Sequence, residues 1–317
     1  MESYGIIDMH CDTLTALIDQ GADMTDGGHH LSLDKMEAGQ YMMQCMAVFL
    51  RLDKGDVYRR CVGYIDGFDR MMARHHDRIG QVRSAADLQA LRAQGRLGAM
   101  LTIEEGGALE GRLDNLRYFY DRGVRMMTLT WNFENEIGYP NNMHQPPFTV
   151  DTVHGLKPFG LQVVRKMNEL GMIVDVSHLD DAGFYDVIAT SSKPVVASHS
   201  DSRAICDVPR NMTDDMIKRL AANGGVMGLN YCADFVNADG SKSVIPGLAA
   251  HARHIAEVGG IDVLALGSDF DGIGDLDDLT GGDRVPALMQ ALTQAGFTAA
   301  DLRKICHDNF LRVLAAQ

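Results

Sequence analysis

Short hydrophobic runs alternate with longer amphipathic segments along the whole chain. Each run is rich in apolar and β-branched residues, and each leads into a segment in which apolar residues recur with helical spacing. This order is typical of repeated strand–helix units around a parallel sheet. Eight runs are expected to form strands, at residues 5–9, 42–50, 97–103, 125–130, 172–176, 194–197, 225–229 and 263–267. Eight parallel strands, each followed by a helix, predict a (β/α)8 barrel of the TIM type.

The segments between these runs carry helix signals. Helices are expected at residues 57–75, 85–94, 158–170, 181–190, 214–223, 246–258, 285–294 and 299–315. Ser84 with Asp87, and Thr298 with Asp301, have the spacing of a capping box. Residues 132–155 are expected to form a long irregular loop after the fourth strand, and such loops are often functional. We expect this loop to cover part of an active site.

Length and charge narrow the class of protein. A barrel with insertions accounts for all 317 residues as one catalytic domain, residues 1–317. The formal net charge of −14 argues against a nucleic-acid partner, because such binding draws on clustered Lys and Arg. No run approaches the ~18–20 apolar residues of a membrane span, and the start lacks a secretory signal. We therefore expect a cytoplasmic protein with no membrane partner, and a homodimer is possible.

Ionisable side chains stand where the expected strands end. They are His10 and Asp12 after the first run, Glu104 and Glu105 after the third, His178 after the fifth, His199 after the sixth and Asp269 after the eighth. The carboxyl ends of the strands in such a barrel meet at one mouth, where barrel enzymes place their active sites. The sequence therefore predicts that these side chains share one small volume.

Imidazole and carboxylate groups together suit zinc, and such a cluster can hold two ions about 3.5–4 Å apart. His10 and Asp12 are two residues apart on a strand and so point to the same side. Glu105 precedes Gly106-Gly107, which lets the backbone crowd the site, and is expected to bridge the two ions. A buried polar network without metal is the alternative, but unpaired buried charge costs several kcal/mol per ion.

With these motifs in place, the chain resembles the renal or membrane dipeptidase family of zinc peptidases over nearly its whole length. Eight motifs in order carry the resemblance: Asp8-Met9-His10-Cys11-Asp12, Glu105-Gly106-Gly107, Gly155-Leu156-Lys157-Pro158-Phe159-Gly160, Asp175-Val176-Ser177-His178, Ser198-His199-Ser200, Pro209-Arg210-Asn211, Asp269-Phe270-Asp271-Gly272 and Asn309-Phe310-Leu311-Arg312. The resemblance implies hydrolysis of dipeptides, including those with a D-residue at the C-terminal side of the scissile bond.

The resemblance also implies roles for individual residues. Two zinc ions per subunit would be held with a water or hydroxide between them, one by His10, Asp12 and Glu105 and the other by Glu105, His178 and His199. Asp269 would manage the proton of that water, in keeping with general acid–base chemistry. Arg210 would bind the substrate carboxylate, for which a planar guanidinium is well suited.

One position departs from the mammalian pattern of this family. Where those enzymes have a histidine after Thr-Leu-Thr, this chain has Trp131, followed by Asn132. Either Asn132 or a zinc ion polarises the substrate carbonyl instead, or the preferred substrate differs; Trp131 is alternatively a packing anchor. Tyr231, just past the seventh strand, is expected to line the substrate pocket.

Two other functions stay open on the sequence alone. The same metal centre could act on N-acyl amino acids, lactams or other cyclic amides, an alternative that Trp131 motivates. A metal-binding scaffold that has lost catalysis is the second alternative, although the expected ligands and Asp269 are all present.

Overall fold

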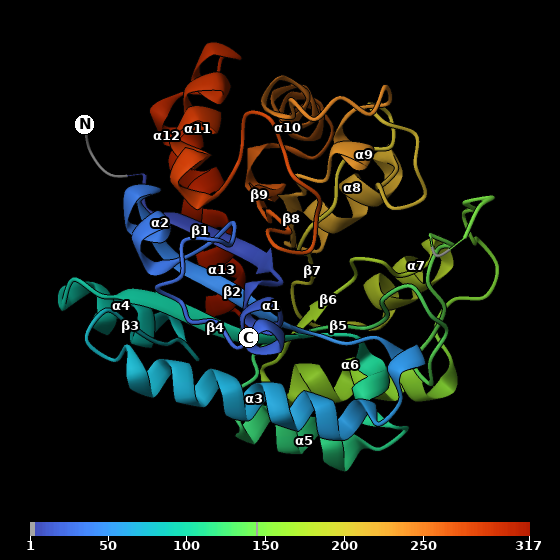
Figure 1. The fold of residues 1–317 in the computed structure, drawn as a ribbon. Helices are drawn as coiled ribbons and strands as arrows, with labels where there is room; N and C mark the ends of the chain where they lie inside the picture. Colours follow the sequence, from blue (N-terminus) through green and yellow to red (C-terminus); the bar gives the residue numbers. More distant parts are fainter. Residues whose placement is uncertain (1–3, 144) are drawn as a thin grey trace.

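Parallel strands form a closed barrel at the centre of the computed structural model, which describes residues 4–143 and 145–317 (Figure 1). Within these residues the barrel strands are β1 (Ile6–Cys11), β2 (Tyr41–Phe49), β4 (Leu97–Glu104), β5 (Met126–Thr128), β6 (Ile173–Asp175), β7 (Val196–Ala197), β8 (Val226–Leu229) and β9 (Leu264–Leu266). They follow the order β2-β1-β9-β8-β7-β6-β5-β4, and the pairing of β2 with β4 closes the ring. The predicted (β/α)8 barrel is confirmed, and each of the eight runs forms one of its strands.

A short additional strand, β3 (Ile79–Gln81), was not predicted. It pairs with the start of β4, whereas β5 pairs with the end of β4. Gly98 of β4 faces Met43 of β2 on one edge and Gly80 of β3 on the other. Strand β3 therefore extends the wall beside β5 and does not interrupt the ring of eight.

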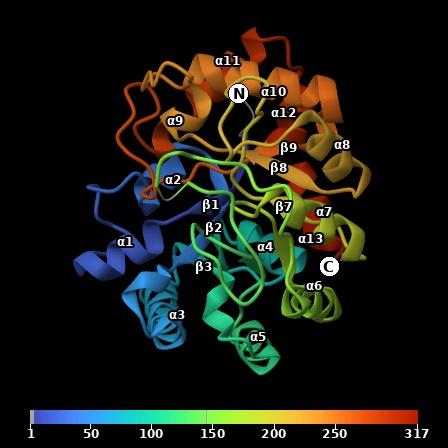
Figure 2. The same cartoon turned by 90° about the vertical axis from the view of Figure 1, so that its right-hand side faces the viewer.

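Helices surround the strands on the outside of the barrel (Figure 2). Seven of them lie within one residue of the predicted bounds: α3 (Val57–Arg74), α4 (Ala85–Ala93), α6 (Pro158–Leu170), α7 (Asp181–Thr190), α8 (Asp214–Ala222), α10 (Ile245–Gly259) and α11 (Val285–Gln294). The structure adds four helices that the pattern did not indicate: α1 (Thr13–Gln20), α2 (Leu33–Ala38), α5 (Leu113–Asp121) and α9 (Ala233–Val236). Among the helices of residues 4–143 and 145–317, none combines the length and the hydrophobicity that a membrane span requires.

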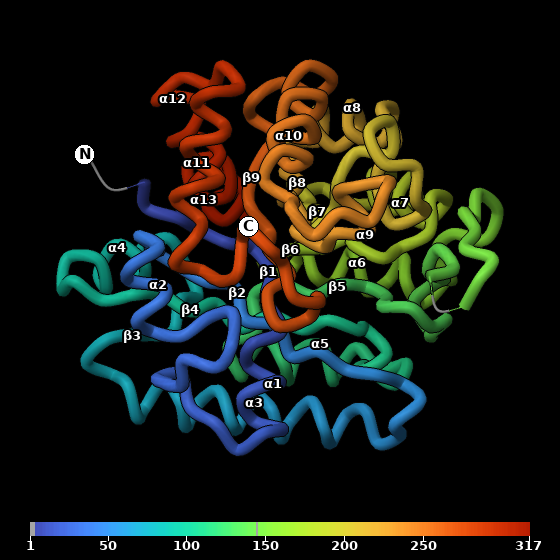
Figure 3. The backbone as a smooth tube through the Cα atoms, turned by 45° about the horizontal axis from the view of Figure 1, so that its top comes forward, coloured from blue at the N-terminus to red at the C-terminus, as the bar shows by residue number. Residues whose placement is uncertain are grey.

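The last predicted helix is divided into three parts. Helix α12 (Ala299–Arg303) passes through a π-helical turn (Lys304–Asp308) into α13 (Asn309–Ala315). Thr298 and Asp301 form the predicted capping box at its start. The side chain of Asn309 donates hydrogen bonds to the carbonyls of Ile261 and Leu264, where β9 begins. The C-terminal helices thereby lie beside the N-terminal segment of the chain, as Figure 3 shows, and leave the opposite mouth of the barrel free.

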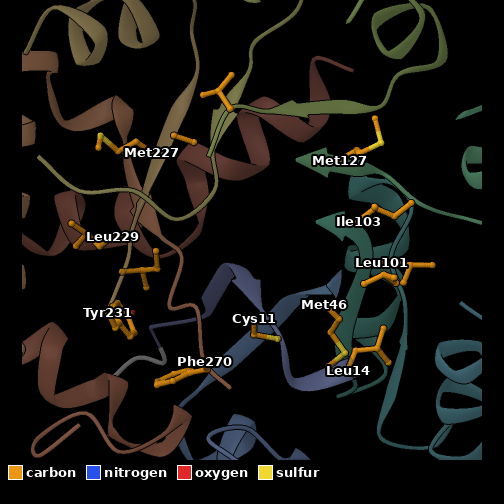
Figure 4. Packing of buried hydrophobic residues seen from close by; sticks show 14 of the residues in the cluster. Cys11, Leu14, Met46, Leu101, Ile103, Met127, Met227, Leu229, Tyr231 and Phe270 are labelled. Atoms are coloured by element: carbon orange, nitrogen blue, oxygen red, sulfur yellow. The ribbon is translucent and has the colours of Figure 1, made fainter. Parts of the chain in front are cut away.

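Strand alternation decides which side chains face the barrel interior. Leu101 and Ile103 of β4 belong to the core that packs between strands and helices, together with Met46 of β2 (Figure 4). The intervening residues of β4, including Thr102 and Glu104, therefore point to the interior. Pairing of β2 with β4 is regular throughout, so Phe49 stands directly beside Glu104 at the mouth.

Strand β1 reaches the same mouth through an irregularity. Asp8 pairs with Gln44 and Cys11 with Met46, so three steps along β1 match two along β2. The extra residue is a β-bulge, a feature that re-aims side chains and is frequent beside active sites. After the bulge, Cys11 packs into the outer core (Figure 4), which leaves His10 and Asp12 for the interior.

The outer core should dominate the stability of this barrel. Replacing the fully buried Leu101 by alanine is expected to lower the free energy of unfolding by about 2–5 kcal/mol, because the methyl groups lost leave a cavity between β4 and its helices. Val153→Ala is the matched control, since this side chain is 80% exposed and should change stability by less than about 0.5 kcal/mol. Urea unfolding measures both, and equal losses for the two variants would contradict the assignment.

Candidate metal centre and active site

Carboxylate and imidazole groups from the strand ends meet below a cavity of about 440 Å³ at the mouth of the barrel. Asp12, Glu104, His178 and Asp269 line this cavity. His10 and His199 lie beneath them, fully buried, with their rings stacked at a centroid distance of 3.7 Å. The structure thus brings six of the seven predicted strand-end residues together in one compact centre: His10, Asp12, Glu104, His178, His199 and Asp269.

Glu104 stands at the middle of this centre. Its Oε2 lies 3.3 Å from Nε2 of His10, and its Oε1 lies 3.0 Å from Nε2 of His178 and 3.5 Å from Nε2 of His199. Three groups have ligand atoms close enough to hold an ion: His10, Asp12 and Glu104; Glu104, His178 and His199; and His10, His199 and Asp269. Glu104 belongs to the first two groups, so its position is that of a bridge.

Glu105, which the sequence analysis placed in this role, points elsewhere. Its backbone has φ 107°, and its carboxylate accepts hydrogen bonds from the backbone N–H of Gly107 (2.6 Å), the side chain of Asn135 (2.5 Å) and the backbone N–H of Trp131 (3.1 Å). Burial raises the pKa of Glu105 to about 7 despite these bonds. The regular alternation of β4 therefore carries Glu104, two residues after the inward Thr102, into the candidate ligand groups, whereas Glu105 lies outside them.

The donor set fits a pair of divalent cations. Nε2 of His10 and Oδ1 of Asp12 are buried and have no hydrogen-bond partner among residues 4–143 and 145–317. Burial, helped by the positive charge of Arg210, holds the pKa of His178 and of His199 well below the usual range, so both are neutral ligands. Burial opposes a charge on His10 as well, but Glu104 and Asp12 outweigh it and raise the pKa of His10 well above normal. A bound cation would take the place of the His10 proton beside the carboxylates of Glu104 and Asp12.

Asp269 approaches the centre from the end of β9. Its Oδ1 lies 3.8 Å from Nε2 of His10, and its Oδ2 accepts a hydrogen bond of 3.0 Å from the side chain of Asn230. Burial raises the pKa of Asp269 to about 6, near the value that suits proton transfer at neutral pH. A side chain at Gly272 would come within 2.7 Å of the carboxylates of Asp12 and Asp269, so only glycine leaves this corner open.

The walls of the cavity are partly aromatic. Trp131 packs edge-on against Phe49, with ring centroids 4.9 Å apart, and Arg51 lies over its ring. Asn132 also lines the cavity, and its Oδ1 lies 3.0 Å from Nδ1 of His178. Later in the expected covering loop, Asp151 contacts α7 through the bond from Ala182 N–H to its carbonyl, whereas Asn135 donates to Glu105. Only the beginning of the loop therefore shapes the site.

Two expected substrate contacts do not line the cavity directly, although the guanidinium of Arg210 lies 5.9 Å from the ring centroid of Phe235, which does. Arg210 is buried behind the cavity, where its guanidinium donates to Oγ of Ser200 and to the carbonyl of His199, both at 2.9 Å. Tyr231 is 1% exposed and packs against Phe270 in the outer core (Figure 4), so its expected place in the pocket is corrected. The alternation of β8 explains this, because it turns Leu229 and Tyr231 outward and Asn230 toward Asp269.

Sequence reasoning missed several residues that now belong to the site. Phe49 and Arg51 line the cavity, Asn230 holds Asp269, and Asp175 with Ser198 stands behind His199. Asn230 could have been found by extending the alternation of its strand by one step. No comparable sequence pattern indicates the contact of Asp175 with Ser198, because it joins strands that are more than twenty residues apart.

Comparison with known proteins agrees with this geometry. The family model described as membrane dipeptidase, peptidase family M19, matches residues 1–317. An uncharacterised protein from the pqqA 5′ region of Klebsiella pneumoniae is 35% identical over 77% of this chain and 91% of its own length. Dipeptidase tcpJ of Claviceps purpurea is 29% identical over 90% of this chain and 68% of its own length.

A solved structure shares the whole architecture. The metallo peptidase of Rhodobacter sphaeroides, crystallised with a phosphinate mimic of the dipeptide L-Ala-D-Ala, superposes with a TM-score of 0.91. The two chains are 25% identical, and the match covers 99% of each. Since the family model spans the full sequence and the fold agrees from end to end, the chain belongs to the membrane dipeptidase family, peptidase family M19.

Proposed function

We propose that this protein hydrolyses the amide bond of dipeptides at a centre that holds two zinc ions, and that dipeptides with a C-terminal D-residue are among its substrates. The observation that carries the proposal is the position of Glu104 between His10 and Asp12 on one side and His178 and His199 on the other. The dipeptide mimic bound by the Rhodobacter sphaeroides metallo peptidase supports the substrate class.

The ligand sets follow from the distances. His10, Asp12 and Glu104 would hold one ion, and Glu104, His178 and His199 the other. Two zinc ions bound there would lower the pKa of a water molecule to about 7 and draw charge from the substrate carbonyl.

Asp269 is the group that moves the proton. Its carboxylate lines the cavity, faces the His10 side of the centre, and is held by Asn230. In the ionised form it accepts a proton from the attacking water, and in the protonated form it donates that proton to the nitrogen of the leaving amine. Burial raises the pKa of this carboxyl to about 6.

Substrate binding is assigned to the residues that line the cavity and to the guanidinium of Arg210 behind it. Arg210 would bind the substrate carboxylate, and the absence of a hydrogen-bond partner for its Nε, among the described atoms, leaves a donor for this purpose. Asn132 and the indole of Trp131 form the wall beside His178, where a substrate carbonyl would lie. The aromatic wall of Trp131, Phe49 and Phe235 also supports a second candidate, hydrolysis of N-acyl amino acids, because an acyl chain could pack there.

A substrate panel tests the proposed reaction. The purified protein should release amino acids from L,L and L,D dipeptides, lose this activity on chelation, and recover it with Zn²⁺. N-acyl amino acids belong in the same panel, and the ratio of kcat/KM between the two classes decides between the candidates. An inactive but zinc-loaded protein across all dipeptides would refute the substrate assignment.

Paired variants test the proposed bridge. Glu104→Gln should lose at least one of the two zinc ions, because an amide is a far poorer ligand than a carboxylate, whereas Glu105→Gln should keep both. Zinc per folded protein, measured by elemental analysis after size-exclusion chromatography, gives the comparison. Loss of zinc from Glu105→Gln alone would restore the original expectation for that residue.

Asp269→Asn tests the proton carrier. The variant should keep both zinc ions and lose about 10²–10⁴-fold in kcat, since an amide cannot transfer the proton. Elemental analysis and dipeptide hydrolysis are measured on the same preparation. Wild-type-like turnover in this variant would exclude Asp269 from the proton path, and a wild type with no turnover would favour the scaffold alternative.

A further inference from the structure

A buried carboxylate stands directly behind the metal centre. Asp175, at the end of β6, is fully buried, and its two oxygens accept four hydrogen bonds. Oδ1 accepts from the backbone N–H groups of Ser177 (3.0 Å) and Ser198 (2.9 Å). Oδ2 accepts from the hydroxyls of Thr128 (2.6 Å) and Ser198 (2.5 Å). This is the environment that an ionised carboxylate requires when buried.

The hydroxyl of Ser198 transmits the effect of this carboxylate. A serine hydroxyl has one proton to donate, and here it goes to Oδ2 of Asp175. The same Oγ lies 2.7 Å from Nδ1 of His199, and it can only accept in that direction. Nδ1 of His199 therefore carries the ring proton, and the lone pair sits on Nε2, which faces Glu104.

His178 is held in the same tautomer from the other side. Oδ1 of Asn132 lies 3.0 Å from its Nδ1 and accepts the proton there. The Nε2 atoms of His178 and His199 are 3.1 Å apart, and each lies within 3.5 Å of Oε1 of Glu104. Two ring nitrogens and a carboxyl oxygen thus converge on one point, an arrangement that a bound cation would stabilise.

We propose that Asp175 is a positioning residue, which acts through Ser198 to direct the Nε2 lone pair of His199 at the cation shared with Glu104 and His178, and thereby sets the affinity of that cation. The inference rests on the proposed function, because it requires the two-ion centre. No ion pair within the described part of the chain involves Asp175, so its charge is compensated by the four hydrogen bonds and by its electrostatic interaction with the buried Arg210.

Asp8 on the opposite side of the barrel shows that a buried carboxylate alone does not give this relay. Its Oδ1 accepts from the backbone N–H groups of His10 and Ser268, at 3.2 and 2.9 Å, and no described bond joins it to an imidazole. Asp8 therefore braces the backbone of β1, whereas Asp175 reaches a ligand ring through a side chain.

Removal of one hydroxyl tests the proposal. Ser198→Ala should lower the affinity for one of the two cations about 10–100-fold, which is the range for loss of a group that orients a metal ligand. Thr128→Val is the matched control, because it removes the other hydroxyl on the same Oδ2 without touching His199, and should change both affinities less than about threefold. Titration of the metal-free proteins with Zn²⁺ against a chromophoric chelator measures both dissociation constants.

Two further variants make the outcome decisive. Ser198→Thr retains the hydroxyl and should recover most of the lost affinity, and Asp175→Asn, measured in the same way, replaces Ser198→Ala if that variant does not fold. Unchanged affinities in Ser198→Ala, or an equal loss in Thr128→Val, would overturn the relay. A wild type that fails to bind two ions would instead overturn the proposed function itself, and with it this inference.

Discussion

The electrostatic demand of Glu104 and its three imidazoles governs the rest of this structure. A carboxyl group and three ring nitrogens within 3.5 Å of it are buried together, and burying such a group is costly unless a proton or a cation neutralises the carboxylate. His10 can supply a proton for this purpose, whereas His178 and His199 are kept neutral by burial. Metal ions bound here would replace that proton, and they would also engage Nε2 of His10 and Oδ1 of Asp12, which have no hydrogen-bond partner among residues 4–143 and 145–317.

At the strand ends that carry the site, the backbone leaves regular geometry. Glu105, His178 and Asp269 all have positive φ, a conformation that costs non-glycine residues roughly 1–3 kcal/mol when strained. Each is secured by neighbours: the N–H of Asp269, for instance, donates to the carbonyl of His10. Strand β1 adds a bulge that turns His10 inward. The rigid barrel thus compensates local strain with ladder hydrogen bonds a few residues away.

Periodicity predicted the architecture well because strands of a barrel are buried on both faces and read as nearly continuous apolar runs. It failed where one residue decides the direction of a side chain. Glu104 and Glu105, like Asn230 and Tyr231, differ in direction by a single step of the alternation, which a strict two-residue count from Thr102 or Leu229 resolves. The Asp175–Ser198 contact is different, because it depends on two strand ends that meet in space, and no sequence pattern in either segment indicates it.

The adjacent residues Glu104 and Glu105 show how one step in a strand couples two parts of a site. One carboxylate points to the cation centre, and the other turns away and accepts the N–H of Trp131, the first residue of the cavity wall. The wall is therefore anchored one residue from the bridge, and Asn132, the next residue, holds His178. The cavity wall and the candidate ligands share these contacts. A substitution of Trp131 that alters substrate preference should therefore also affect the position of His178. Variation of the cavity should instead be easiest at Phe49 and Arg51, which contact the wall without supporting a ligand.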